Sequence, residues 1–423
     1  GGHRFITGVP WILERVRSIV GDRLSLRTRK SFVFLDGTSI EYPLRFGDLM
    51  RKLGPIENAR AVLSYVAATP RRWRRRSPSN LEEWLAPRFG RYLYRRVFEG
   101  YSEKLWGHHP TQMSPEWAPQ RISIPSLGGY LRELFAPSRR PPRTYAREYL
   151  YPDLGIGEIP ERFAATVVAN GGEIRVGTEV TRLRRRAGEW IATLTSREDC
   201  EERAFDGIVG TITPTRLTGL LVGEATEGEP LPQRGLRFLN LGFDRPVPLD
   251  ATWIYQPDPL CRFTRIQIPA ARSRRMVPEG CGSIQLEEPW RTDDPSTFDD
   301  RVAQAGRTLD PLGLDLGTPT VAFETYAPDA YPIYRGGSRR RARDLIAQLE
   351  ARAAVRVAGR QGRFDYIFFD RAIAQGVNAV RDLVGAARLP EVASASTPDA
   401  PLPLVEAQSM VGHSASGMGG DPL

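Results

Sequence analysis

The stretch that most constrains the fold is residues 355–384, VRVAGRQGRFDYIFFDRAIAQGVNAVRDLV. It predicts a short strand, a glycine-rich turn at Gly359 and Gly362, and a helix from Asp370 to about Val384. The first amides of such a helix lack partners and its dipole is positive there, so this end can stabilise an anion or a polarised carbonyl. The alternative is an ordinary strand–helix unit that Asp370 caps.

Other segments also predict a mixture of helices and strands typical of an α/β protein. A helix is expected over 159–169, followed by strands at 173–176, 179–184, 190–195 and 205–212. Residues 235–290 are rich in strand-forming segments, and Asp36-Gly37 predicts a hairpin. An amphipathic helix is expected over 11–20, and helical structure over 80–105 with a break near Pro87. At 423 residues, the chain is long enough for two or three substructures.

Charge and cysteine content exclude several classes. The net charge is +9, but only three of the 59 basic residues are lysines, and the arginines are spread along the whole chain. We therefore expect no nucleic-acid partner, although an arginine patch would favour anionic ligands. Three cysteines with no C-x-x-C pair predict neither a disulfide framework nor a zinc site, and indicate a cytoplasmic location.

Hydrolase and nucleotide-triphosphate motifs are not supported. The sequence has no Gly-Lys-Ser/Thr, and residues 412–417 only approximate a nucleophile elbow. The neighbours His108 and His109 lack the spacing of two ligands on one helix face, so we expect no metal. No apolar run is long enough to span a bilayer, so no transmembrane segment is expected.

Several motifs together resemble one family. Gly359-Arg-x-Gly with Tyr366, Asp370 and Ala372-Ile373 resembles the C-terminal flavin motif of the UDP-galactopyranose mutases, within the wider protoporphyrinogen oxidase and amine oxidase-like group of FAD proteins. Further segments agree with that group in the same order along the chain: Gly1-Gly-His3-Arg-Phe5, Glu41-Tyr-Pro43, Phe89-Gly-Arg, Gly100-Tyr-Ser-Glu-Lys-Leu-Trp106, and Gly172 to Val180.

The resemblance implies an α/β FAD-binding Rossmann-like domain of discontinuous segments, with inserted helical and β-sheet substrate regions. The implied FAD-binding segments are 1–50, 156–215 and 336–390. The implied substrate regions are 51–155, mainly helical, and 216–335, rich in β-strands. The tail, 391–423, is expected to be disordered because its composition is dominated by Ala, Ser, Pro and Gly. The G-x-G-x-x-G segment that opens the family's fold is not in the sequence, and we expect it to lie before Gly1.

The resemblance also implies site residues. His3 and Arg360 would act beside the flavin of a bound FAD. The expected cofactor contacts are Gly1, Gly2, His3, Val180, Gly359, Arg360, Asp370 and Ala372. The expected substrate contacts are Arg121, Tyr255, Arg265 and Tyr331.

Three functions remain open on the sequence. The first is a mutase that acts on a small molecule such as a nucleotide sugar through reduced flavin, without net redox. The second is a flavin oxidase or desaturase for an amine, porphyrinogen or polyene, with a pocket lined by Trp106, Trp117, Trp253 and Phe263. The third is an inactive remnant.

Overall fold

A computed structural model describes residues 2–42, 51–68, 77–118, 148–221, 230–291, 293–387 and 389. The α-helices are α1 (Pro10–Val20), α3 (Pro55–Ala67), α5 (Leu81–Phe89), α6 (Arg91–Leu93), α7 (Gly100–Trp106), α10 (Glu158–Ala169), α11 (Pro214–Gly219), α12 (Phe298–Leu309), α13 (Ser338–Glu350), α14 (Gly359–Gly362) and α15 (Phe369–Leu383). The π-helix η2 is Tyr94–Glu99, and the 3₁₀ turns are η1 (Gly21–Arg23), η3 (Pro110–Gln112), η4 (Pro115–Trp117), η6 (Pro269–Ala271), η7 (Arg274–Met276) and η8 (Asp310–Leu312).

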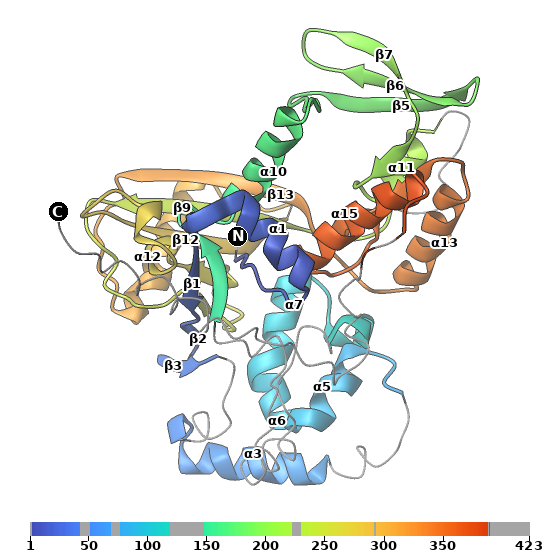
Figure 1. The fold of residues 1–423 in the computed structure, drawn as a ribbon. Coiled ribbons are helices and arrows are strands. Elements are labelled where there is room, and N and C mark those ends of the chain that lie inside the picture. Colours follow the sequence, from blue (N-terminus) through green and yellow to red (C-terminus); the bar gives the residue numbers. More distant parts are fainter. Residues whose placement is uncertain are drawn as a thin grey trace, which may run out of the picture.

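The strands are β1 (Leu24–Thr28), β2 (Ser31–Leu35), β3 (Thr38–Glu41), β4 (Glu148–Pro152), β5 (Glu179–Arg186), β6 (Glu189–Thr195), β7 (Cys200–Phe205), β8 (Ile208–Gly210), β9 (Gln233–Phe243), β10 (Trp253–Tyr255), β11 (Arg265–Gln267), β12 (Gly282–Pro289), β13 (Val321–Pro332) and β14 (Val355–Val357). In Figure 1 the helices α3, α5 and α6 lie at one end of the molecule, and the three-stranded sheet β5–β6–β7 lies at the opposite end. This combination of helices and sheets confirms the predicted α/β fold class.

The largest sheet has seven strands in the order β13-β9-β12-β11-β10-β2-β3. All its neighbours are antiparallel except β10 and β2, which run parallel with Trp253 opposite Ser31. One side of β9 buries alternate residues, including Leu239 and Leu241, and α12 packs there through Ala305 and Leu309. This sheet supplies one wall of the site described below.

The hairpin β2–β3 forms where the sequence predicts it. Asp36 and Gly37 have φ of 49° and 76°, the positive values that the two central residues of a tight hairpin turn need. Because β2 pairs with β10, the hairpin extends the seven-stranded sheet. The segment 1–50 therefore contributes to this sheet as well as to the expected FAD-binding part.

The C-terminal unit also follows the prediction. β14 pairs in parallel with β8, and α13 and α15 both pack against β14. The expected strand at 205–212 is wrong as one element: a turn at Asp206-Gly207 separates β7 from β8. Residues 173–176 form no strand, because Glu173 and Arg175 are exposed and make ion pairs with side chains of β7 instead.

The helical region departs from the prediction at its break. Pro87 lies inside α5, and the chain turns at Gly90 instead. Gly90 has φ +79°, and a Cβ there would lie 2.7 Å from the amide nitrogen of Tyr65, so no larger residue fits. Trp84 and Leu85 of α5 are buried in a core that also contains Leu35, Tyr331 and Tyr366. The helical region, the hairpin and the C-terminal unit thus share one hydrophobic core.

No helix within the described ranges is long and apolar enough to cross a membrane. The predicted disordered tail, 391–423, lies outside the described residues.

Candidate cofactor and substrate site

The first residues of the chain are fixed by β4. Phe5 is fully buried and exchanges two backbone hydrogen bonds with Leu150, at 3.2 and 3.0 Å. Gly2 lies directly against Arg265 of β11, since a Cβ on Gly2 would meet the guanidinium carbon at 2.7 Å. A glycine here lets the backbone approach this arginine closely. His3, which lies between Gly2 and Phe5, is consequently held close to the seven-stranded sheet.

His3 is surrounded by positive charge. Loss of solvent around the ring, followed by the nearby positive charges that include Arg360, Arg265 and Arg272, together lowers the pKa of His3 to about 3. At neutral pH His3 is therefore an uncharged imidazole, which can donate or accept a hydrogen bond but carries no positive charge. The positive potential of the site comes from the arginines.

Arg265 is one of the buried arginines of this group, with 7% of its surface exposed. Its guanidinium donates to the carboxylate of Glu287, which lies opposite on β12. Burial alone would lower its pKa, but Glu287 and the nearby tyrosines 331 and 255 raise the pKa well above its usual value. Arg265 is therefore a permanent cation, and Tyr255 and Tyr331, two predicted substrate residues, lie within its electrostatic reach.

Arg360 joins this group from the C-terminal unit. It donates to the carbonyl oxygens of Ala330 at 3.3 Å and Ile367 at 2.8 Å. Its guanidinium lies 5.6 Å from the ring centre of Tyr331 and 5.0 Å from that of Tyr366. The predicted catalytic residues His3 and Arg360 and the predicted substrate residues Arg265, Tyr255 and Tyr331 thus converge on one region.

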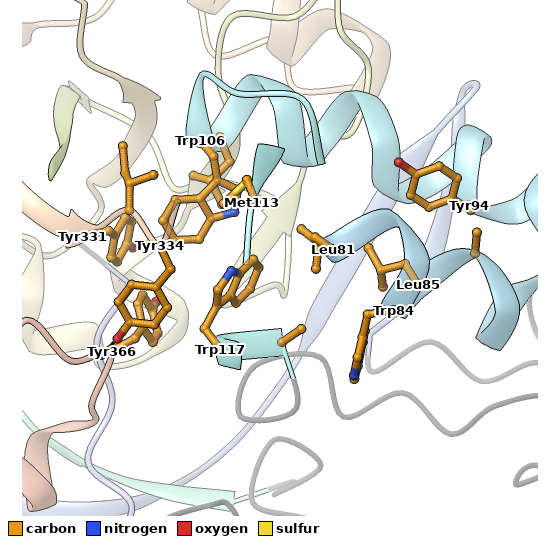
Figure 2. Packing of buried hydrophobic residues seen from close by; sticks show 14 of the residues in the cluster. Leu81, Trp84, Leu85, Tyr94, Trp106, Met113, Trp117, Tyr331, Tyr334 and Tyr366 are labelled. Carbon is orange, nitrogen blue, oxygen red and sulfur yellow. Dashed lines mark hydrogen bonds between the residues drawn. The ribbon is translucent and has the colours of Figure 1, made fainter. Parts of the chain in front are cut away.

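An aromatic wall borders Arg360. The rings of Tyr331 and Tyr366 are 5.3 Å apart, and Trp106 lies 5.8 Å from Tyr331 and 5.0 Å from Trp117. Figure 2 shows these rings gathered between the helical region and the C-terminal unit. Trp106, Trp117, Trp253 and Phe263 are all at most 5% exposed, so these four side chains pack in the core.

A second cluster of arginine and aromatic side chains surrounds Trp253. The guanidinium groups of Arg4, Arg29 and Arg272 lie 5.5, 5.3 and 5.4 Å from its ring centre. Tyr255 lies 6.5 Å away. Arg4 and Arg272 were not predicted from the sequence, because scattered arginines give no signal until the sheet brings them together.

This region contains several buried hydrogen-bond donors without a hydrogen-bond partner among the described residues. They are Arg4 Nη1, Tyr149 Oη, Trp253 Nε1, Arg265 Nε and Arg272 Nε. A buried polar group that makes no hydrogen bond is costly, at roughly 1–3 kcal/mol each. The five groups can all donate, so the region matches a ligand rich in acceptor oxygens.

The beginning of α15 is built differently from the prediction that Asp370 caps it. Phe368 is the N-cap residue, and Asp370 is the second residue of the helix. Asp370 is fully buried, and its carboxylate accepts a hydrogen bond from the amide of Arg371 at 2.8 Å. Gly359 has φ +83° and donates its amide to Gln375 Oε1 at 3.0 Å, which ties the glycine-rich turn to α15. The amide of Ala372 bonds to the Phe368 carbonyl within the helix.

A cleft of about 350 Å³ lies between α13 and α15 over β14. The charged side chains that line the cleft are Arg339, Arg343, Arg356, Arg363, Arg371, Glu350, Asp365 and Asp382. Gln375, the partner of Gly359, also lines it, so the cleft borders the glycine-rich turn. It is a polar cleft with more arginines than acids.

The remaining predicted residues lie elsewhere. Val180 pairs with Leu194 in the β5–β6–β7 sheet, and no described contact joins it to His3 or Arg360. Gly1 and Arg121 lie outside the described residues.

Comparison with known proteins identifies the class as a flavoprotein oxidoreductase. Residues 127–383 match the model of the flavin containing amine oxidoreductase family, a stretch longer than half of the chain. The chain belongs to this family, and it is an FAD-dependent enzyme. A search of curated proteins finds no sequence that matches it.

Three solved structures share the fold. A reduced UDP-galactopyranose mutase is 20% identical, with 94% of this chain and 86% of that chain covered and a TM-score of 0.78. A candidate protoporphyrinogen oxidase from Exiguobacterium sp. 255-15 is 18% identical over 83% of this chain and 80% of that one, with a TM-score of 0.60. Cyclohexylamine oxidase from Brevibacterium oxydans IH-35A is 12% identical over 90% and 86%, with a TM-score of 0.56.

The donor-rich region fits the flavin end of FAD. Flavin carries ring carbonyl oxygens, and its reduced form is anionic, so unpartnered guanidinium, indole and phenol donors suit it. Gly2 keeps the backbone close to Arg265, and His3 offers a neutral imidazole beside the same surface.

Proposed function

We propose that this enzyme acts on a sugar nucleotide through reduced flavin, in the manner of UDP-galactopyranose mutase. The observation that carries the proposal is the charge of the site: Arg265, Arg272 and Arg360 all act on His3, and buried donors nearby have no hydrogen-bond partner within the part of the chain that the structure describes. Such a surface attracts a diphosphate and repels the ammonium group of an amine substrate. The 0.78 TM-score with a reduced UDP-galactopyranose mutase supports the same choice.

In this proposal each residue has a defined task. Gly2, Gly359, Asp370 and Ala372 shape the surface against which FAD lies. His3 holds a neutral hydrogen bond beside the flavin, and Arg360 offsets negative charge there. Arg265, Tyr255 and Tyr331, with Arg121, bind the substrate and exclude water. Reduced FAD supplies an electron-rich ring, so the reaction isomerises the sugar without net oxidation.

The alternative is an oxidase or desaturase. The rings of Tyr331 and Tyr366 beside the Arg360 guanidinium favour it, because aromatic rings suit an apolar or cationic substrate. The buried state of Trp253 and Phe263 speaks against the wide apolar pocket that this function would need.

One experiment separates these functions. Protein with its flavin content measured is incubated with UDP-galactopyranose or its furanose isomer, with and without prior reduction by dithionite, and the nucleotide sugars are separated by chromatography. We expect interconversion only in the reduced samples, and a strong loss in Arg265→Lys but not in the exposed control Arg340→Lys. Bleaching of oxidised flavin by amines or polyenes, with no interconversion, would favour the oxidase. Protein that binds no flavin would favour the remnant.

A further inference from the structure

A histidine and two glutamates far apart in the sequence meet in the helical region, away from the arginines around His3. Glu82 lies in the first turn of α5, Glu99 ends the π-helix η2, and His109 precedes the 3₁₀ turn η3. One potential ligand atom from each lies within 4.8 Å of the other two. The Nε2 atom of His109 is 3.6 Å from Glu99 Oε1. All three side chains are partly buried, so bulk water screens their charges incompletely.

Two carboxylates held this close repel each other unless a cation lies between them. The arginines that flank the cluster in sequence, Arg91 and Arg95, are exposed. Of the three cluster residues, His109 is the one that can carry positive charge, and it does so only when it is protonated. An ion bound by one nitrogen and two carboxylate oxygens would remove this repulsion.

A buried hydroxyl gives the second observation. Tyr94 is 0% exposed, and its hydroxyl makes no hydrogen bond of normal geometry among the described residues. Burial raises its pKa, and the charges of Glu82 and Glu99 raise the pKa further, which places this hydroxyl next to both carboxylates. Tyr94 therefore adds a fully buried oxygen beside Glu99, on the same side of the cluster.

The imidazole can present Nε2 to an ion. The other ring nitrogen, Nδ1, lies 2.8 Å from Thr111 Oγ1, close enough to donate a hydrogen bond to that hydroxyl. This is the arrangement in which Nδ1 carries the proton and Nε2 is free to ligate. The contact from the Thr111 amide to Nδ1 is longer, at 3.3 Å, and belongs to the opposite tautomer.

We propose that Glu82, Glu99 and His109 bind one divalent transition-metal ion, of which zinc is the best match, with the Tyr94 hydroxyl beside it. One imidazole with two carboxylates is a ligand set that zinc accepts, and water can complete a tetrahedral shell at this partly open position. The ion would join α5, η2 and η3. Met113 follows η3, and its carbonyl oxygen accepts a hydrogen bond from the Leu81 amide at 2.9 Å. The bound ion would therefore also stabilise the segment that carries Trp117.

The test uses the full chain and two probe ions. Metal-free protein is titrated with Zn²⁺ by calorimetry and with Co²⁺ by visible spectroscopy, which reports a tetrahedral nitrogen and oxygen shell. We expect one ion per chain, a rise in Tm on adding Zn²⁺, and at least a roughly tenfold weaker affinity in His109→Ala and in the isosteric Glu99→Gln. Tyr94→Phe keeps the ring and should alter the Co²⁺ spectrum.

Matched controls come from the same segment. His108→Ala removes the adjacent histidine, and Glu103→Gln removes an exposed carboxylate of α7, so both should bind like the parent. Circular dichroism and the metal-free Tm check that each variant is folded. Equal binding by parent, His109→Ala and Glu99→Gln would mean an adventitious ion only, and binding without saturation would equally overturn the proposal.

Discussion

The guanidinium of Arg360 lies 5.0 Å from the ring centre of Tyr366 and donates to the carbonyl of the next residue, Ile367, at 2.8 Å. One side chain thus stacks on an aromatic ring and satisfies a backbone acceptor of the segment that leads into α15. This relationship ties the glycine-rich turn to the aromatic wall, and it suggests that Arg360 supports the local fold as well as the charge of the site.

Arg360→Ala should therefore cost both stability and cofactor. Loss of two hydrogen bonds to carbonyl oxygens and of the stacking on Tyr331 and Tyr366 should lower the free energy of unfolding by about 2 kcal/mol. The fraction of purified protein that carries flavin should fall as well. Urea denaturation and absorbance spectra measure the two effects, and Arg340→Ala on the exposed side of α13 is the control. Unchanged flavin content would remove Arg360 from the cofactor site.

His3 should remain neutral far into the acid range. Its pKa in the folded protein, about 3, is below the 6.5 of an ordinary histidine, so the unfolded chain binds more protons between these pH values. The contribution of His3 to stability is therefore fully present above pH 6.5 and is lost as the pH falls towards 3. NMR titration of the His3 ring follows this directly, and His3→Asn should flatten the dependence of Tm on pH. A midpoint near 6.5 in the folded protein would contradict the electrostatic picture.

Lys104 anchors the loop between β10 and β11. Its ammonium group donates to the backbone carbonyls of residues 256, 258, 261 and 263 at 2.5, 2.8, 3.0 and 3.1 Å. Burial lowers its pKa to about 8, which leaves it charged at neutral pH. Lys104→Met should destabilise the protein by about 2–3 kcal/mol, because the carbonyls lose a charged donor. Lys52→Met, at an exposed lysine, should cost far less in the same denaturation experiment.

Asp294 and its sequence neighbour Asp293 differ in burial and in their ion pairs, so their effects on stability can be compared. It lies in a network with Arg262 and Arg237, whereas Asp293 is exposed. Burial alone would raise the pKa of Asp294, but hydrogen bonds from Ser296 and the two arginines lower the pKa to about 2. Its stabilisation is thus present above about pH 4 and is lost as the pH falls through 2.

Asp294→Asn should consequently lower stability at pH 7 by about 3 kcal/mol, because it leaves a cluster of buried arginines undercompensated. Asp293→Asn should change it little. Thermal denaturation at pH 7 and at pH 2.5 checks both effects, since the difference between the two variants should shrink at the lower pH. Equal losses in the two variants would show that the network contributes nothing.

Local patterns carried much of the fold. Periodic apolar residues predicted α1 and α15 to within a residue or two, and Asp36-Gly37 predicted its hairpin because few residues adopt two successive positive φ values. The strand at 173–176 failed because pairing depends on a partner strand, which a single segment cannot reveal. The break at Gly90 instead of Pro87 was missed because the close approach of Tyr65 to Gly90 is a tertiary contact.

The candidate site was predictable only in part. His3, Arg265, Arg360 and Tyr331 were expected from the family's motifs, and they converge in the structure. Arg4 and Arg272 were missed because the sequence contains dozens of arginines and no pattern distinguishes these two from the others. Glu82, Glu99 and His109 were invisible for another reason: their spacing matches no single-helix metal motif, and only the folding of three segments joins them.

The packing of Trp106 between Trp117 and Tyr331 has a consequence for how this chain can be divided. Residues 331–366 and 81–118 both contribute to that core, so neither segment has a complete interior of its own. A fragment cut at 118 would leave large aromatic rings facing water and should aggregate. The helical region is consequently not expected to fold when it is moved into another protein. A substitution of one ring in this shared core should need a compensating substitution in the ring that it contacts.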